Sequence, residues 1–399
     1  MVYKNKQGVV AVCGAVCIFL LVATGFILNS HPSGYLSPSV IKSDRHTFSS
    51  SSPKHFASAQ LTKETQLPHP SEALQQISRF DSYGLSTAKC DEEFGRLFKE
   101  IERSAAHRQN TGNVTPADLD LAWVSKPDDG TLFVLEAKLK NEYYPPRALS
   151  ILHQIDRAIT ASPEPVPDIE FSFIVKDLPD ESHAHHTFWA LSRLPIDKET
   201  WLMPDFGYWS WPLDLVGSYE QIRVEIIQNQ KPWEERVPKI LWRGALKTNK
   251  VREAMYKITR GKKWADIEEI KWKNRTEVSP ASATSVMSMV DHCDYQYLMH
   301  TEGRSYSGRG KYLLNCGSVM VMHKSEWIEP HHDLYVKSGP EQNIVEVERD
   351  FSDLEEKMQK LLKDPQLARQ IAMNSQKTFR DRYLTAAAQA CYWRKVFRS

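Results

Sequence analysis

A glycine-rich, cationic loop is the part of the sequence best suited to chemistry. Residues 302–311 read EGRSYSGRGK and lie between a predicted strand and a predicted helix. Glycines permit a tight turn and a close backbone approach, and the first turn of a helix offers free amides and a partial positive charge. Arg304, Arg309 and Lys311 add cations that can hydrogen-bond a phosphate. We therefore predict a phosphate-binding loop; the alternative is a surface turn with solvated charges.

This loop differs from two known catalytic motifs. It nearly matches the P-loop, G-x4-G-K-[ST], but Arg309 stands where the lysine belongs. Its spacing also differs from that of the G-x-S-x-G nucleophile elbow. A diphosphate leaving group, as in a nucleotide sugar, would suit a metal-free site of arginines and helix amides, because such donors stabilise developing charge.

Two further candidates follow predicted strands. The segment WRGA, which contains Arg243, comes directly after KIL, and the carboxyl end of a strand faces the crevice where α/β proteins bind ligands. A structural ion pair is the alternative for this arginine. The pair Lys176-Asp177 comes directly after DIEFSFIV, and Asp177 could act as a general base on a hydroxyl. An aspartate at a strand end is also a common turn residue.

Other clusters favour structural interpretations. Asp118 and Asp120 spell the DxD of metal-dependent glycosyltransferases, but they fall in the first turn of a predicted helix, where acids favour the dipole. Trp209 and Trp211, in PDFGYWSWP, could stack on a sugar or a base, or pack in a core. Two loop clusters lack the spacing of a closed metal site, so no metal site is predicted: His183, His185 and His186, and His331, His332 and Asp333.

Strands and helices alternate along the chain around these residues. Residues 250–279 are predicted to be mostly helical. The alternation predicts an α/β body of two units with a closing C-terminal helix. The strands are predicted at 131–137, 168–175, 239–242, 295–300 and 318–323, and the other helices at 90–108, 147–160, 219–228, 311–315, 353–362, 365–375 and 379–397.

The composition is that of a globular protein. Of 399 residues, 41% are hydrophobic and 25% are charged. Basic residues number 51 against 50 acidic ones, a formal net charge of +1, which argues against a nucleic-acid partner bound through bulk charge.

The N-terminal region predicts a membrane anchor. Gly8–Leu28 is uncharged and apolar and is long enough to span a bilayer. Lys4 and Lys6 precede it, so the positive-inside rule predicts a cytosolic tail at 1–7, a signal anchor at 8–28 and a lumenal remainder, a single-pass type II protein. A signal peptide is the alternative. Residues 29–75 are rich in Ser, Pro, His and Lys and are predicted to form a flexible, disordered stem.

Two glycosylation sequons agree with a lumenal body. They begin at Asn113 and Asn274. An oxidising lumen would also permit disulfides. Two of the six cysteines lie in the apolar span, and the remaining four allow three pairings: Cys90, Cys293, Cys316 and Cys391.

Several segments, taken in order, resemble glycosyltransferase family 90. They are DIEFSFIVKDLP, PDFGYWSWP, KILWRGA, the long block 290–330 and the tail QACYW. That family includes fungal capsule-associated xylosyltransferases and animal protein O-glucosyltransferases. The resemblance covers roughly residues 165–399, or extends from near Cys90.

The resemblance implies a GT-B fold of two Rossmann-like domains that face a cleft. An acceptor-side α/β domain would comprise residues 76–215, a nucleotide-sugar-binding α/β domain 216–375, and a closing helix 376–399. The implied reaction inverts the anomeric carbon without a covalent intermediate. It uses a UDP-sugar donor and a glycan or glycoprotein hydroxyl as acceptor, with no tightly bound cofactor and an open metal requirement.

The resemblance also assigns residues. Asp177 would be the base, and Cys293–Cys316 and Cys90–Cys391 would be disulfides. The animal enzymes typically have serine where this chain has Ala245, and their loop is apolar before the arginine, so the sugar, xylose or glucose, stays open. The implied donor-binding residues are Phe206, Trp209, Arg243, Gly244, Arg304, Ser305, Tyr306, Ser307, Gly308 and Arg309.

These observations predict an inverting, UDP-sugar-dependent glycosyltransferase. The chain ends VFRS, without an ER-retention tetrapeptide, so the Golgi membrane is favoured over the ER. One alternative is a non-catalytic lumenal glycan-binding protein. The other is a different, P-loop-like phosphate-binding enzyme.

Overall fold

The structure is a computed structural model that describes residues 82–115, 119, 123–126, 131–137, 139, 142–178, 188–211, 216–271 and 285–399. Within these ranges, no helix has both the length and the apolar character needed to cross a bilayer. Asn113 lies exposed after a helix, as a glycosylation site requires. Several predictions fall outside the described residues: the tail, anchor and stem at 1–75, the Asp118–Asp120 motif, the cluster His183–His186 and the sequon at Asn274.

A five-stranded parallel sheet organises the C-terminal part of the chain. Its order is β12-β11-β10-β8-β9, and every neighbouring pair is parallel. This sheet confirms the predicted mixed α/β class. Its strands are β8 (Val237–Gly244), β9 (Ala265–Glu269), β10 (Tyr295–His300), β11 (Val319–His323) and β12 (Val345–Val347).

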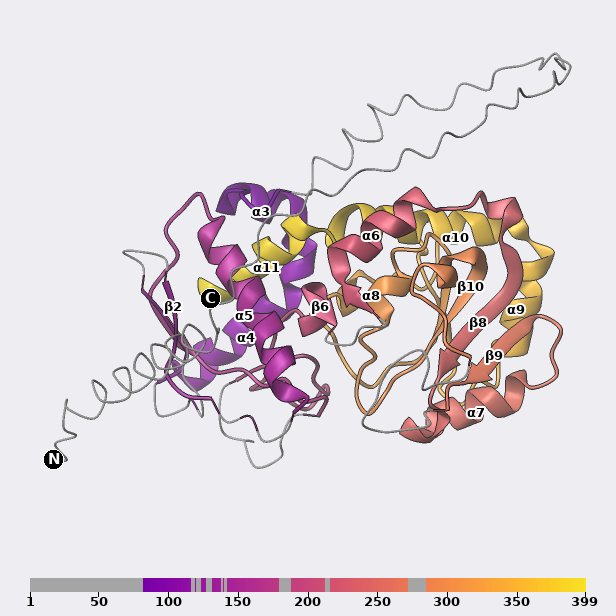
Figure 1. Ribbon diagram of the computed structural model, residues 1–399, viewed down its shortest axis with the longest axis horizontal. Coiled ribbons are helices and arrows are strands. Elements are labelled where there is room, and N and C mark those ends of the chain that lie inside the picture. Colours follow the sequence, from indigo (N-terminus) through magenta and orange to yellow (C-terminus); the bar gives the residue numbers. More distant parts are fainter. Residues whose placement is uncertain are drawn as a thin grey trace, which may run out of the picture. The chain divides into compact units, whose positions relative to one another are not determined.

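Both faces of the central strands are buried, as expected for a parallel sheet. In β8, Ile240 and Trp242 join a core on one face, while Leu241 joins a second core on the other. The first core is covered by helices α7 (Lys250–Thr259), α9 (Leu354–Lys363) and α10 (Pro365–Thr378). Figure 1 shows these helices beside β8, β9 and β10.

The preceding part of the chain combines helices with short strands. An antiparallel sheet has the order β2-β1-β3, and two two-stranded pairs join β4 to β5 and β6 to β7. The strands are β1 (Trp123–Lys126), β2 (Thr131–Val134), β3 (Ile169–Phe171), β4 (Trp189–Ala190), β5 (Trp201–Leu202), β6 (Ser210–Trp211) and β7 (Gly217–Ser218). The helices are α3 (Thr87–Phe94), η1 (Gly95–Phe98), α4 (Lys99–Thr111), α5 (Tyr144–Thr160), η4 (Phe206–Tyr208) and α6 (Tyr219–Gln228).

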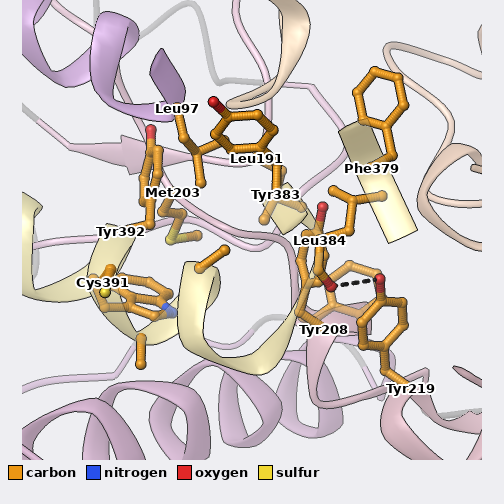
Figure 2. Packing of buried hydrophobic residues seen from close by; sticks show 14 of the residues in the cluster. Leu97, Leu191, Met203, Tyr208, Tyr219, Phe379, Tyr383, Leu384, Cys391 and Tyr392 are labelled. Atoms are coloured by element: carbon orange, nitrogen blue, oxygen red, sulfur yellow. Dashed lines mark hydrogen bonds between the residues drawn. The ribbon is translucent and has the colours of Figure 1, made fainter. Parts of the chain in front are cut away.

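The last helix, α11 (Ala386–Phe397), returns to the N-terminal helices. It packs against α3 and α5 (Figure 1), and the Cys90–Cys391 disulfide joins it to α3. Figure 2 shows the core around it, where the Tyr219 hydroxyl donates a hydrogen bond to the Leu384 carbonyl over 3.1 Å. The remaining short helices are η5 (Trp233–Glu235), η6 (Leu246–Thr248), η8 (Asp291–Asp294), α8 (Gly310–Leu313), η9 (His332–Leu334) and η10 (Phe379–Tyr383).

The structure corrects several predicted elements. Residues 265–269, expected to be helical, form the edge strand β9, and β12 was not predicted at all. The sequence pattern does not reveal this strand, because ADIEE is acidic and its carboxylates lie at a sheet edge rather than in a core. The single helix predicted at 379–397 is wrong: the π-helical turn η10 ends at Tyr383, and Thr385 caps α11 by accepting from the Ala388 amide.

Candidate functional site

The two strands that carry predicted site residues are neighbours in the sheet. β8 lies beside β10, and β9 lies on the other side of β8, so the strand order reverses between β8 and β10. In open α/β sheets, ligands bind beyond the carboxyl ends of the strands at such a reversal. β8 ends at Arg243–Gly244, and β10 runs directly into the cationic loop. The fold therefore brings together two regions that the sequence could only treat separately.

Arg309 joins these two regions. Its Nη1 donates a hydrogen bond to the Arg243 carbonyl, and its guanidinium lies 5.7 Å from the centre of the Trp242 ring. Burial and the charges of Arg252 and Arg243 lower the pKa of Arg309 to about 9, which still leaves it charged at neutral pH. Its buried Nε has no hydrogen-bond partner, and no described carboxylate forms an ion pair with it. An uncompensated buried cation is a suitable anion-binding group.

Arg252 is a second cation of this kind, which the sequence analysis missed. It lies in the first turn of α7, 5.6 Å from the Trp242 ring. Its guanidinium donates to the carbonyls of Glu302, over 2.9 Å, and Ala245, over 3.2 Å. Burial lowers its pKa to about 10, and no ion pair with a described carboxylate neutralises it. In the sequence, the helix cap Asn249 was the available signal that Arg252 lies in the first turn of a helix.

Arg243 itself forms a structural ion pair, which is the alternative that the sequence analysis gave for it. Its Nη2 lies 2.7 Å from Asp266 Oδ1 on β9. The Tyr295 hydroxyl donates to the other oxygen of that carboxylate over 2.5 Å. The structure therefore places Arg243 in an ion pair, and its contact with a donor stays a prediction.

Lys311 does not supply the cation that the loop sequence predicted. Its Nζ lies 2.8 Å from Asp205 Oδ2 and donates to the Gly308 carbonyl over 2.6 Å. The side chain is buried by aromatic rings, including that of Tyr208. Lys311 therefore joins the loop to η4. Asp205 neutralises its positive charge, so the charge is not available to a phosphate. Arg304, by contrast, is exposed at the surface.

Close packing explains the glycines of the loop. Gly303, Gly308 and Gly310 all have negative φ, so none of them needs a left-handed backbone. A Cβ at Gly308 would lie 2.5 Å from a ring carbon of Trp211, and one at Gly310 would lie 2.8 Å from Cε1 of His300. The glycines let the loop approach aromatic rings.

Asp177, the candidate base, lies next to this loop. Its carbonyl accepts a hydrogen bond from Ser305 Oγ. Its carboxylate pairs with Arg147 over 2.8 Å, and its side chain is 40% exposed. The Arg147 guanidinium in turn lies 4.6 Å from the centre of the Phe206 ring. A half-exposed carboxylate held by one arginine is available to a substrate hydroxyl.

The two aromatic candidates are packed. Phe206 is buried against Trp211, with ring centres 4.9 Å apart. Trp209 stacks on His153, 4.8 Å between ring centres, and receives the Arg157 guanidinium at 4.8 Å. Their proposed contact with a donor stays a prediction.

The structure contains both disulfides that the resemblance implies, Cys90–Cys391 and Cys293–Cys316. Among the described side chains, no three histidines, cysteines or carboxylates group as a metal site would need. His331, considered as a ligand, instead places its Nε2 3.0 Å from the Tyr335 hydroxyl.

Comparison with known proteins gives one family and several relatives. Residues 132–399 match the model described as glycosyl transferase family 90. Protein O-glucosyltransferase 1 of Rattus norvegicus is 26% identical over 273 residues, which are 63% of this chain and 66% of the relative. The O-glucosyltransferase rumi homolog of Aedes aegypti is 28% identical over 258 residues, 58% of this chain and 61% of the relative. The match thus spans slightly less than two thirds of these relatives.

Proposed function

The chain belongs to glycosyl transferase family 90, and on that premise we propose that it transfers a sugar from a UDP-sugar to a hydroxyl of a glycan or glycoprotein. Xylose or glucose is the proposed sugar; relatives named O-glucosyltransferases favour glucose. The proposal includes a GT-B arrangement, inversion at the anomeric carbon, and residence of the catalytic region in the lumen of the Golgi or ER.

One observation carries this proposal: the loop after β10 touches both other candidate regions. Ser305 donates a hydrogen bond to the carbonyl of Asp177, and Arg309 donates one to the carbonyl of Arg243. A candidate base and uncompensated cations therefore lie around this one loop.

The proposed reaction is a single displacement. Asp177 takes the proton of the acceptor hydroxyl as its oxygen attacks the anomeric carbon. The bond from that carbon to the diphosphate breaks, and UDP leaves with the electron pair. Arg309 and Arg252 then stabilise the charge on the departing diphosphate. Attack from the face opposite the leaving group inverts the anomeric centre.

A donor screen tests the proposal. UDP release is measured with UDP-xylose, UDP-glucose and other nucleotide sugars, with a glycoprotein acceptor, and with and without a chelator. We expect release from at least one UDP-sugar. Binding of ATP in preference to UDP would instead indicate a different phosphate enzyme, and sugar binding without hydrolysis or transfer would indicate a glycan-binding protein.

A further inference from the structure

Arg147 binds the carboxylate of Asp177, the candidate base. Its Nη1 lies 2.8 Å from Asp177 Oδ1, and the same nitrogen donates a hydrogen bond to the Val175 carbonyl over 3.1 Å. The arginine therefore contacts both the carboxylate and the backbone two residues before it. Ser305 Oγ donates to the Asp177 carbonyl. Ser305 thus fixes the main chain of the base, and Arg147 fixes its side chain.

The carboxylate of Asp177 is held at one oxygen and open at the other. Among the described residues, Arg147 alone forms an ion pair with Asp177, and none donates a hydrogen bond to Oδ2. The side chain of Asp177 is 40% exposed, whereas that of Arg147 is only 19% exposed. A general base must lie within hydrogen-bond reach of the proton that it takes. A carboxylate fixed through Oδ1 can offer Oδ2 to a substrate hydroxyl.

One face of α5 carries Arg147 and is anchored further along the helix. Arg147, Ser150 and Gln154 are three and four residues apart, so they share a helix face. Ser150 Oγ donates to the Ser210 carbonyl over 3.2 Å, in β6. Gln154 Nε2 donates to the carbonyl of Asp205, the cap of η4, over 3.0 Å. These bonds fix the helix that presents the arginine.

An aromatic ring supports the guanidinium of Arg147. The guanidinium lies 4.6 Å from the centre of the Phe206 ring. Phe206 is itself 1% exposed and packs against Trp211, with ring centres 4.9 Å apart. Groups that orient a reacting side chain need their own positions locked by packing and hydrogen bonds. Arg147 meets this requirement through the Phe206 ring and the Val175 carbonyl.

We propose that Arg147 is a positioning residue, which holds the Asp177 carboxylate so that Oδ2 faces the acceptor hydroxyl. This inference rests on the proposed function, in which Asp177 is the base. The proton of the hydroxyl passes to Oδ2 while Arg147 keeps its hydrogen bond to Oδ1. The hydroxyl oxygen bonds to the anomeric carbon, and UDP leaves with the electron pair of the broken bond. Arg147 touches neither substrate and acts through Asp177 alone.

The first test is the variant Arg147→Met, which removes the charge and both hydrogen bonds but keeps an unbranched side chain over the Phe206 ring. We expect kcat to fall about 10- to 100-fold, because misplacement of a reacting group by about 1 Å can cost about 100-fold. The KM for the UDP-sugar and the Kd for UDP should stay at their wild-type values. The unchanged Kd also shows that the variant is folded. Arg147→Lys keeps the charge and a donor, so it should recover part of the lost rate.

A double-mutant cycle tests whether Arg147 acts through Asp177. If it does, adding Arg147→Met to Asp177→Asn should not slow transfer beyond the rate of Asp177→Asn alone. Additive losses would show that the arginine contacts a substrate on its own and would overturn the positioning role. A wild-type kcat in Arg147→Met, or a loss of UDP affinity equal to the loss of rate, would also overturn it.

Arg382→Met is the matched control, because Arg382 makes the same kinds of contact elsewhere. It donates to the Glu93 carbonyl over 2.9 and 2.7 Å, pairs with the Glu93 carboxylate over 3.7 Å and lies 5.2 Å from the centre of the Tyr383 ring. This variant should keep the wild-type kcat. A wild-type protein that releases no UDP from any UDP-sugar would contradict the proposed function itself. An active wild type with additive losses in the cycle would overturn only the role of Arg147.

Discussion

Ser305 donates its side-chain hydrogen bond to the backbone carbonyl of Asp177, 128 residues earlier in the sequence. This contact ties the loop after β10 to the segment that follows β3. It engages the main chain of Asp177 and leaves the carboxylate to Arg147. Replacement of the Asp177 side chain should therefore leave the loop in place, which makes the two parts of the site separable by experiment.

Arg309→Ala should slow transfer by about 30- to 1,000-fold. The loss of a positioned donor at a developing anion costs about 2–4 kcal/mol of transition-state stabilisation, and no carboxylate in the described part of the chain pairs with Arg309 to explain its burial otherwise. The rate constant at saturating donor is the measurement. Arg260→Ala, at an exposed position just after α7, is the control and should be neutral. An Arg309 variant with the wild-type rate constant would remove this residue from the mechanism.

Gly308→Ala should destabilise the protein and reduce its activity. The added Cβ would lie 2.5 Å from the Trp211 ring, and overpacking of this kind costs about 1–3 kcal/mol. The free energy of unfolding from urea titration checks this. Gly95→Ala is the matched control because no atom lies within 4 Å of its new Cβ. Equal stabilities of the two variants would show that the loop can move away from Trp211.

The sequence predicted the central strands of the five-stranded sheet, but it did not predict the edge strands β9 and β12. β8, β10 and β11 are apolar runs buried on both faces, so their composition reveals them. The residues of β9 are predicted to be helical because this edge strand is acidic rather than apolar. One of its carboxylates, Asp266, forms an ion pair with Arg243. No local pattern discloses such a long-range partner.

The candidate site was predicted in outline, but its charges were not assigned correctly. Arg309 and Lys311 are equally cationic in the sequence, and only the fold supplies Asp205 to Lys311. Arg252 looked like one more basic residue of a helix, because the lack of a carboxylate partner is a tertiary property.

Loss of the Cys90–Cys391 disulfide should destabilise the protein by about 2–5 kcal/mol. This bridge joins α3 to α11 across 301 residues, whereas Cys293–Cys316 closes a loop of 23. Because a longer closed loop restricts the unfolded chain more, the double serine variant at Cys90 and Cys391 should lose more stability than that at Cys293 and Cys316. Urea titration of both variants gives the comparison. The reverse order would show that local packing outweighs chain entropy.

The titration of the Glu329 carboxyl should lower the free energy of unfolding as the pH rises. Its pKa is raised from 4.5 to about 8 by burial and by Asp205. The folded state therefore binds this proton more tightly than the unfolded chain does. Its contribution is complete below about pH 4.5 and is lost progressively as the pH rises through 8.

Glu329→Gln removes this titration. The free energy of unfolding of the wild type, relative to the variant, should decline between pH 5 and about pH 8. Urea titrations of both proteins across that range measure it. Parallel pH profiles would show that Glu329 titrates normally in the folded protein.

The central claim is that Asp177 and the loop that carries Arg309 work on the same substrate. Isothermal titration with UDP and transfer kinetics on Asp177→Asn test it most directly. We predict a wild-type Kd for UDP and a rate of transfer lower by about 100- to 10,000-fold, because the base is lost while the diphosphate site remains. Near-wild-type transfer by this variant would contradict the account.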